Sequence, residues 1–187
     1  MKNHFAKLST LTLLFVSIAS WTYAQTTRQS SIRYSVGADV GLPLGNFSDA
    51  YKWSLGGSIQ ADIPVLNNIL YVTINAGYNN IFADKSVSQF TDDIHLIPVK
   101  AGLKFFPVAN FYVQGEAGVS FILDQKASSE KSASFLYAPQ LGYLFPLGGK
   151  SNIDAGVRFE GNSKFTRNGS TNNFLGLRVA YAFPIGK

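Results

Sequence analysis

The sequence contains no cysteine and few charged residues. Asp, Glu, Lys and Arg make up 14% of its 187 residues, against about 25% in ordinary soluble domains. The absence of cysteine excludes disulfide scaffolds, thiol catalysis and zinc sites built on cysteine. The hydrophobic content of 46% is too high for a disordered chain. Length and composition therefore predict a single folded domain.

A long hydrophobic run is also missing. The longest apolar stretch, residues 8–20, has about 13 residues, which is short of the roughly 20 that a membrane-spanning helix needs. Lys2 and Lys7 precede it, and Thr22-Tyr23-Ala24 follows it with small residues at both cleavage positions. This order is typical of a secretory signal peptide. We therefore predict a signal peptide over residues 1–24 and a mature domain over residues 25–187.

The positive charge is small. The formal net charge of +5 falls to +3 when Lys2 and Lys7 are removed with the signal peptide. A nucleic-acid-binding domain usually carries a larger and clustered positive excess. We expect no nucleic-acid partner.

Apolar and polar residues alternate along most of the mature chain, which is the period of a β-strand. Eight such runs of about ten residues can be traced, a length that crosses a bilayer when the strand is tilted. The eight runs are residues 33–42, 54–63, 70–79, 97–105, 111–121, 137–145, 153–160 and 175–183.

The links between the runs alternate in length. Residues 64–69, 107–110 and 146–152 are short links, whereas residues 43–52, 82–93, 124–134 and 162–173 are longer and more polar. This alternation predicts an antiparallel meander with a turn end and a loop end. Every second run finishes on an apolar residue followed by proline, at Pro64, Pro107, Pro146 and Pro184. Proline donates no ladder hydrogen bond, so we expect each of these strands to stop there.

Alternation alone leaves open which face is inside, because a soluble lipocalin-like barrel and a membrane barrel differ in just this respect. Two features favour a polar interior. Every run places a glycine on its polar face, where small residues suit a narrow barrel. The polar face also carries five basic and five acidic side chains, which suits a buried and paired network. The glycines are Gly37, Gly56, Gly77, Gly102, Gly118, Gly142, Gly156 and Gly176. The charged residues are Arg33, Asp39, Asp62, Lys100, Lys104, Glu116, Asp154, Arg158, Glu160 and Arg178.

The apolar face carries aromatic residues near both ends of the strands, as in the two aromatic girdles of membrane barrels. Five lie near the turn end and five near the loop end. The turn-end residues are Tyr34, Phe105, Phe111, Phe145 and Tyr181, and the loop-end residues are Trp53, Tyr78, Phe121, Tyr137 and Phe159. We therefore predict an all-β, eight-stranded antiparallel up-and-down transmembrane β-barrel.

The sequence as a whole resembles small outer-membrane β-barrels of Gram-negative bacteria, of the OmpX/Ail-like and OmpA membrane-domain kinds. The loop segment of residues 43–52 and the Phe-Pro strand ends are similar to the outer-membrane β-barrel-domain (porin-family) proteins of Bacteroidetes. Gly176, Val179 and Tyr181 match the Gly-x-x-apolar-x-aromatic signal that the barrel assembly machinery reads in the last strand. The chain departs from that pattern by continuing past Phe183.

The resemblance implies an integral outer-membrane protein with both termini in the periplasm, and outer-membrane lipid and lipopolysaccharide as partners. It implies a non-enzymatic role in envelope integrity, adhesion or ligand contact. We expect no metal, no cofactor and a monomer, and an eight-stranded barrel filled by its own side chains has no open pore.

Two alternatives stay open. His95 is the single histidine of the mature chain and lies beside Asp92 and Asp93, so one alternative is a lipid A-modifying enzyme with a catalytic histidine. The other is a soluble periplasmic carrier of a lipocalin-like kind. Pro98 and Pro139 lie inside predicted strands, where a central strand rejects proline, so we expect a bulge or a ladder break near the loop end there.

Overall fold

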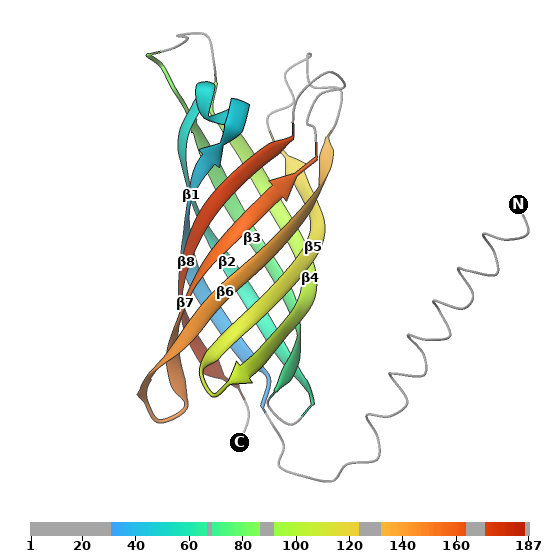
Figure 1. Ribbon diagram of the computed structural model, residues 1–187, viewed down its shortest axis with the longest axis vertical. Helices are drawn as coiled ribbons and strands as arrows, with labels where there is room; N and C mark the ends of the chain where they lie inside the picture. Colours follow the sequence, from blue (N-terminus) through green and yellow to red (C-terminus); the bar gives the residue numbers. More distant parts are fainter. Residues whose placement is uncertain (1–30, 67–68, 87–91, 124–131, 164–170, 186–187) are drawn as a thin grey trace, which may run out of the picture. The chain divides into compact units, whose positions relative to one another are not determined.

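A computed structural model of the chain describes residues 31–66, 69–86, 92–123, 132–163 and 171–185. These residues form a closed barrel in which each strand pairs with the next and the eighth pairs with the first (Figure 1). The predicted signal peptide lies outside the described residues. The strands are β1 (Arg33–Leu44), β2 (Tyr51–Leu66), β3 (Leu70–Ala83), β4 (Ile94–Val108), β5 (Phe111–Ile122), β6 (Ala133–Gly148), β7 (Ser151–Asn162) and β8 (Asn172–Pro184).

All eight strand pairs are antiparallel, so the predicted eight-stranded up-and-down barrel is confirmed. The barrel closes through β1 and β8, which pair from Arg33 opposite Pro184 to Leu44 opposite Asn173. The backbone N–H of Ile185 donates to the carbonyl of Ile32 at 3.3 Å. Both described ends of the chain therefore meet at the turn end of the barrel.

The side chains alternate between the two faces along each strand, as the pleat requires. In β8 the residues Leu175, Leu177, Val179 and Tyr181 are between 45% and 49% exposed, whereas Arg178 between them is 1% exposed. The same pattern recurs around the barrel. The polar face points inward and the apolar face points outward, which is the inverse of a soluble barrel.

The proline that follows each even strand does not stop three of them, contrary to the prediction. β2, β4 and β6 run past Pro64, Pro107 and Pro146 by one or two residues, with a register shift beside each proline. Beside the turn, an irregular pair accommodates the N–H that proline lacks, so the ladder of hydrogen bonds does not end at the proline. Only β8 ends on its proline, Pro184.

The predicted disturbance at Pro98 and Pro139 takes the form of a ladder break without a bulge. Pairing of β3 with β4 runs from Leu70–Phe105 to Ala76–Val99, skips two pairs at Pro98, and resumes at Asn79–Leu96 in the same register. Pairing of β6 with β7 likewise skips two pairs at Pro139 and resumes in register. Each proline thus interrupts the hydrogen bonding locally and leaves the alternation of faces intact above it.

A short 3-10 helix, η2 (Gly45–Asp49), joins β1 to β2 at the loop end (Figure 1). Several strands extend further toward this end than the alternation predicts, as β6 does by starting at Ala133. The turn end is tighter, and Gly148 and Gly149 both adopt positive φ where β6 turns into β7, a conformation that favours glycine. No helix among the described residues is long and apolar enough to cross a membrane.

Candidate functional site: the charged interior of the barrel

The structure places all ten predicted charged residues on the inner face of the barrel. Nine of them are buried, and Arg33 keeps 19% of its side chain exposed at the turn end. Their ion pairs divide them into two groups of five. The turn-side ion cluster consists of Arg33, Asp62, Lys104, Asp154 and Arg178. The loop-side ion cluster consists of Asp39, Lys100, Glu116, Arg158 and Glu160.

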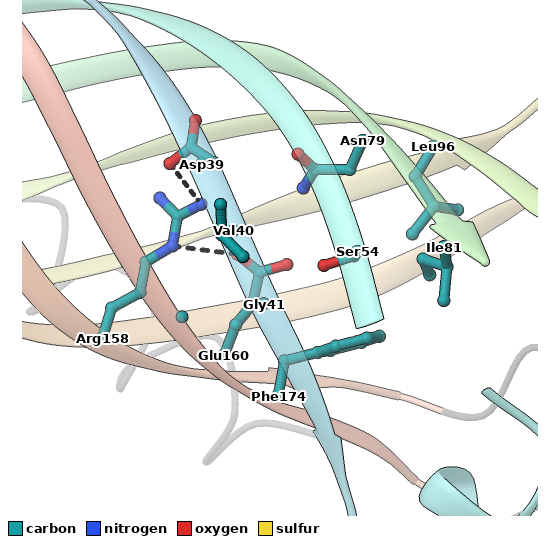
Figure 2. Close-up of a pocket in the computed structure, with 11 residues that line it drawn as sticks. Asp39, Val40, Gly41, Ser54, Asn79, Ile81, Leu96, Arg158, Glu160 and Phe174 are labelled. Atoms are coloured by element: carbon teal, nitrogen blue, oxygen red, sulfur yellow. Dashed lines mark ion pairs between the residues drawn. The ribbon is translucent and has the colours of Figure 1, made fainter. Parts of the chain in front are cut away.

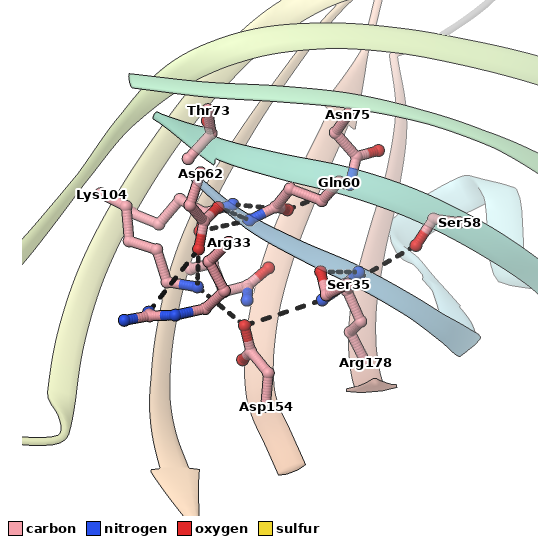
Figure 3. Close-up of polar contacts among 12 residues, drawn as sticks. Arg33, Ser35, Ser58, Gln60, Asp62, Thr73, Asn75, Lys104, Asp154 and Arg178 are labelled. Atoms are coloured by element: carbon pink, nitrogen blue, oxygen red, sulfur yellow. Dashed lines mark hydrogen bonds and ion pairs between the residues drawn. The ribbon is translucent and has the colours of Figure 1, made fainter. Parts of the chain in front are cut away.

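Lys104 is the centre of the turn-side ion cluster (Figure 3). Its Nζ lies 2.7 Å from Asp154 Oδ2 and 3.1 Å from Asp62 Oδ2, and its side chain is fully buried. Arg178 reaches the same Asp154 Oδ2 at 3.8 Å, while Arg33 lies 3.9 Å from Asp62. A buried ammonium is stable only with several charged or polar partners, and two carboxylates supply them here.

Neutral polar side chains complete the turn-side ion cluster. The guanidinium of Arg178 donates to Ser58 Oγ and Ser35 Oγ, both at 3.0 Å. Gln60 Nε2 donates to Asp62 Oδ1 at 2.7 Å, and the Tyr112 hydroxyl donates to Asp154 Oδ1 at 2.5 Å. The bonds of Arg178 and Tyr112 join strands that are distant in the sequence, and together with the bond of Gln60 within β2 they fix the charged groups in one arrangement.

The loop-side ion cluster is built around Lys100 and Arg158. Figure 2 shows the Arg158 part of it, with Asp39 and Glu160. Lys100 Nζ lies 3.6 Å from Glu116 Oε2 and 3.5 Å from Glu160 Oε2. Arg158 Nη2 lies 2.8 Å from Asp39 Oδ1, and its Nε lies 3.7 Å from Glu160 Oε2. Three carboxylates therefore share two cationic side chains.

At seven of the eight predicted interior glycines a Cβ would come within 3.0 Å of an atom of a neighbouring strand, and at Gly176 the nearest atom would be Arg158 Cγ at 3.2 Å. A Cβ at Gly142 would overlap the ring of Tyr112, and a Cβ at Gly156 would lie 2.5 Å from Gln140 Nε2. These two glycines make the space in which Tyr112 is completely buried. At Gly102 and Gly118 the obstacle is the backbone of the adjacent strand. The glycines therefore allow a narrow interior to hold long charged side chains.

Two apolar clusters lie inside the barrel beyond the ion clusters, one toward each end. The turn-end apolar cluster is Tyr71, Phe106, Tyr112 and Leu144. The loop-end apolar cluster is Ile81, Leu96, Ile122 and Phe174, against which Phe47, Tyr51 and Ile94 pack. The sequence pattern predicted neither cluster. The alternation of faces along the strands did place Tyr71 and Tyr112 on the inner face. This alternation was the sequence signal for the turn-end apolar cluster.

The structure places His95 on the outer side of the barrel near the loop end, within β4. Its Nδ1 is 2.6 Å from the hydroxyl of Tyr78, and the two rings stack with their centroids 6.0 Å apart. Tyr78 is 45% exposed on the apolar face. The pair therefore belongs to the aromatic residues of the outer surface rather than to the charged interior.

Acidic residues at the loop end are engaged by the protein itself. Ser86 donates to Asp84 from both its hydroxyl and its N–H, and Lys52 Nζ lies 3.0 Å from the same carboxylate. The Ser86 hydroxyl, helped by Lys52, lowers the pKa of Asp84 to about 2. Asp93 accepts a hydrogen bond from the N–H of Ala83 at 2.9 Å. Within the described ranges no group of three or more His, Asp or Glu residues could hold a metal ion.

Comparison with known proteins identifies the fold. No protein-family model matches the chain, and no curated protein matches it in sequence. Among solved structures it is similar to Ail, the attachment invasion locus protein of Yersinia pestis, with 19% identity, 82% of this chain and 99% of that chain covered, and a TM-score of 0.51.

Two proteins of Pseudomonas aeruginosa are similar as well. For the outer membrane protein OprG the identity is 11%, with 84% of this chain and 96% of that chain covered and a TM-score of 0.55. For the N-terminal β-barrel domain of OprF the identity is 15%, with 81% of this chain and 97% of that chain covered and a TM-score of 0.50. The chain therefore has the fold of the small outer-membrane β-barrels, as its sequence predicted.

Proposed function

We propose that the protein is a non-enzymatic integral β-barrel of a bacterial outer membrane. The observation that carries the proposal is the orientation of the two faces. Large apolar side chains are exposed on all eight strands, Ile59 at 60% and Leu103 at 53% among them, while charged side chains are buried inside. An apolar belt of this kind is unfavourable in water and matches the hydrocarbon layer of a bilayer. A soluble carrier of apolar ligands needs the opposite arrangement.

The proposed orientation places the turn end and both termini in the periplasm and the loop end outside the cell. One prediction from the sequence and two observations of the structure support it. A signal peptide would deliver the chain to the periplasm, the number of strands is even, and the two described ends meet at the turn end. Short periplasmic turns and longer external loops are also the usual arrangement in such barrels.

The proposed role lies in the loops, because side chains fill the described interior of the barrel. The loops would contact lipopolysaccharide or an external ligand, and so serve envelope integrity or adhesion. The name of Ail as an attachment protein makes adhesion one concrete form of this role. Assembly would depend on the barrel assembly machinery, with Val179 and Tyr181 on the outer face of β8 as part of the signal. We expect a monomer.

Fractionation of cells that express the protein tests the proposal. We expect recovery in the outer membrane, with a shift in gel mobility when the sample is boiled, because a closed barrel resists detergent until it is heated. Recovery in the soluble periplasmic fraction without such a shift would contradict it. The enzymatic alternative has its own test, since an active lipid A-modifying enzyme would lose its effect on lipid A when His95 is replaced by alanine.

A further inference from the structure

The outer face of the barrel is hollowed where β1, β2 and β3 lie side by side. A shallow, open hollow of about 410 Å³ lies there, and Val36, Gly57, Ile59, Ala76 and Tyr78 line it; we call it the outer hollow. Gly57 and Ala76 contribute little or no side chain, whereas the other three are between 45% and 60% exposed. A Cβ at Gly57 would contact only a backbone carbonyl at 3.5 Å. The outer hollow therefore results from small residues between larger ones.

Three polar side chains lie beside the outer hollow on its loop-end side. The hydroxyl of Tyr78 is 2.6 Å from Nδ1 of His95 on β4. Asn80 follows Tyr78 by two residues and so shares its outward face, and it lies opposite His95 in the ladder. We call these three residues the outer polar cluster. Polar side chains that face lipid are unfavourable unless they have polar partners, so this cluster indicates contact with a polar part of a lipid.

The position of the outer polar cluster along the strands shows which part of a lipid it would meet. Trp53 and Phe82, which pair in the ladder of β2 and β3 and stack with their ring centroids 4.4 Å apart, lie nearer the loop end. Aromatic rings of this kind mark the headgroup level of a membrane. The outer polar cluster therefore lies where headgroups join acyl chains, and the outer hollow lies among the acyl chains.

The chemistry of Tyr78 favours a lipid that donates hydrogen bonds. A phenolic oxygen offers more than one hydrogen-bonding position, so the pairing with His95 leaves the Tyr78 oxygen able to accept a further bond. The ester groups of a phospholipid accept hydrogen bonds but donate none. The amide and hydroxyl groups beside the acyl chains of lipid A can donate. The loop end also faces the leaflet that contains lipopolysaccharide in the proposed orientation.

We propose that this face of the barrel binds one lipopolysaccharide molecule through its lipid A part. An acyl chain lies in the outer hollow over Gly57 and Ala76, and an amide or hydroxyl group at the head of the chain donates to the Tyr78 oxygen, which His95 holds in place. Dispersion contacts with the sides of the outer hollow add up along the chain. The proposal rests on the membrane orientation proposed above, and it assigns a lipid partner to the barrel wall as well as to the loops.

Trp53 provides a reporter near the outer hollow, because the second tryptophan, Trp21, belongs to the predicted signal peptide. The mature barrel is reconstituted in vesicles of phosphatidylcholine with brominated acyl chains, which quench tryptophan fluorescence on contact. Unbrominated lipid A or unbrominated phosphatidylethanolamine then replaces part of the brominated lipid. We expect lipid A to relieve the quenching several-fold more than its share of the lipid, with saturation. Phosphatidylethanolamine should relieve it only in proportion to its share.

Two variants show whether the preference arises at the outer hollow. Gly57→Leu fills it with a side chain, and Tyr78→Phe removes the hydroxyl but keeps the ring. We expect both to reduce the relief by lipid A to its share of the lipid. Gly115→Leu and Tyr137→Phe are the matched controls elsewhere on the outer face. A Cβ at Gly115 would meet nothing within 4 Å, and Tyr137 is 46% exposed, so both controls should keep the wild-type preference.

Equal relief by lipid A and phosphatidylethanolamine in the wild type would overturn the proposal. So would a preference that persists in Gly57→Leu or Tyr78→Phe, or one that both controls lose. Relief that grows with the ratio of protein to lipid in the absence of lipid A would mean that a second barrel covers the outer hollow, and would also contradict it. Should Gly57→Leu fail to insert, Tyr78→Phe decides the question. A barrel recovered in the outer membrane without the preference contradicts this inference alone, whereas a soluble barrel contradicts the proposed function.

Discussion

Arg158 makes the shortest ion pair of the loop-side ion cluster, and it has no substitute there. Its Nη2 lies 2.8 Å from Asp39, and the side chain is 6% exposed. In Arg158→Leu the carboxylate of Asp39 stays buried without a cation. Breaking a buried pair from one side costs about 3–5 kcal/mol, so we expect the free energy of unfolding in micelles to fall by about that amount.

Arg33→Leu is the matched control for this prediction. Arg33 is 3.9 Å from Asp62 and partly exposed, and Asp62 keeps Lys104 and Gln60 as partners when Arg33 is removed. The loss should therefore be clearly smaller than for Arg158→Leu. Equal urea midpoints for wild type and Arg158→Leu would show that the interior network contributes nothing to stability.

The sequence predicted on which face of the barrel each side chain lies, but not which side chain it contacts. Parity places Lys104 and Asp154 on the inner face, yet their 2.7 Å contact joins β4 to β7 across the barrel. Such a contact depends on the tilt and stagger of the strands, which alternation in a single sequence does not specify. The division of ten charges into two clusters with opposite excess could therefore be read only from the structure.

The strands themselves were well predicted because one face differs sharply from the other in their central parts. Near the loop end this contrast disappears, since inner and outer residues are both apolar. Ile81 is buried and lies next to outward-facing Phe82, and buried Ile122 lies between exposed Phe121 and Leu123. The period of two is invisible in such segments. The predicted strands consequently ended too early, and the loop-end apolar cluster was missed.

The central part of β8 provides a test of which face meets the membrane. Val179 is 45% exposed and lies near the middle of the strand, between Ala38 of β1 and Ala155 of β7. An arginine on the lipid face near the bilayer midplane costs about 2–4 kcal/mol. We expect Val179→Arg to lower the free energy of unfolding by about this amount when the barrel is folded in lipid vesicles.

Val108→Arg is the control that distinguishes the effect of depth in the bilayer from the effect of the added charge itself. Val108 is 68% exposed and ends β4 at the turn end, where the cost of arginine falls to about 0–1 kcal/mol. A Val179→Arg variant as stable as Val108→Arg would show that residue 179 does not face hydrocarbon, and the proposed membrane location would then be wrong.

In the whole molecule the interior is layered from one end to the other. The turn-end apolar cluster is followed by the turn-side ion cluster, the loop-side ion cluster and the loop-end apolar cluster. Apart from Arg33, which stays partly exposed at the turn end, the ion clusters lie buried between apolar layers, and this burial strengthens the ion pairs. A barrel built in this way acts as a rigid stem, so contact with other molecules falls to its two ends and its outer surface.

The two ends are predicted to face different compartments, and the absence of cysteine from the sequence makes this directly measurable. Ser48 is exposed in η2 at the loop end, and Lys150 is exposed in the turn between β6 and β7. Single cysteines at these positions are treated on intact cells with a maleimide that does not cross the outer membrane. We expect Ser48→Cys to be labelled at once and Lys150→Cys only after the outer membrane is permeabilised. The wild-type protein, without cysteine, is the blank. Labelling of Lys150→Cys on intact cells, with Ser48→Cys protected, would mean that the turn end faces outward and that the loops cannot serve external contact.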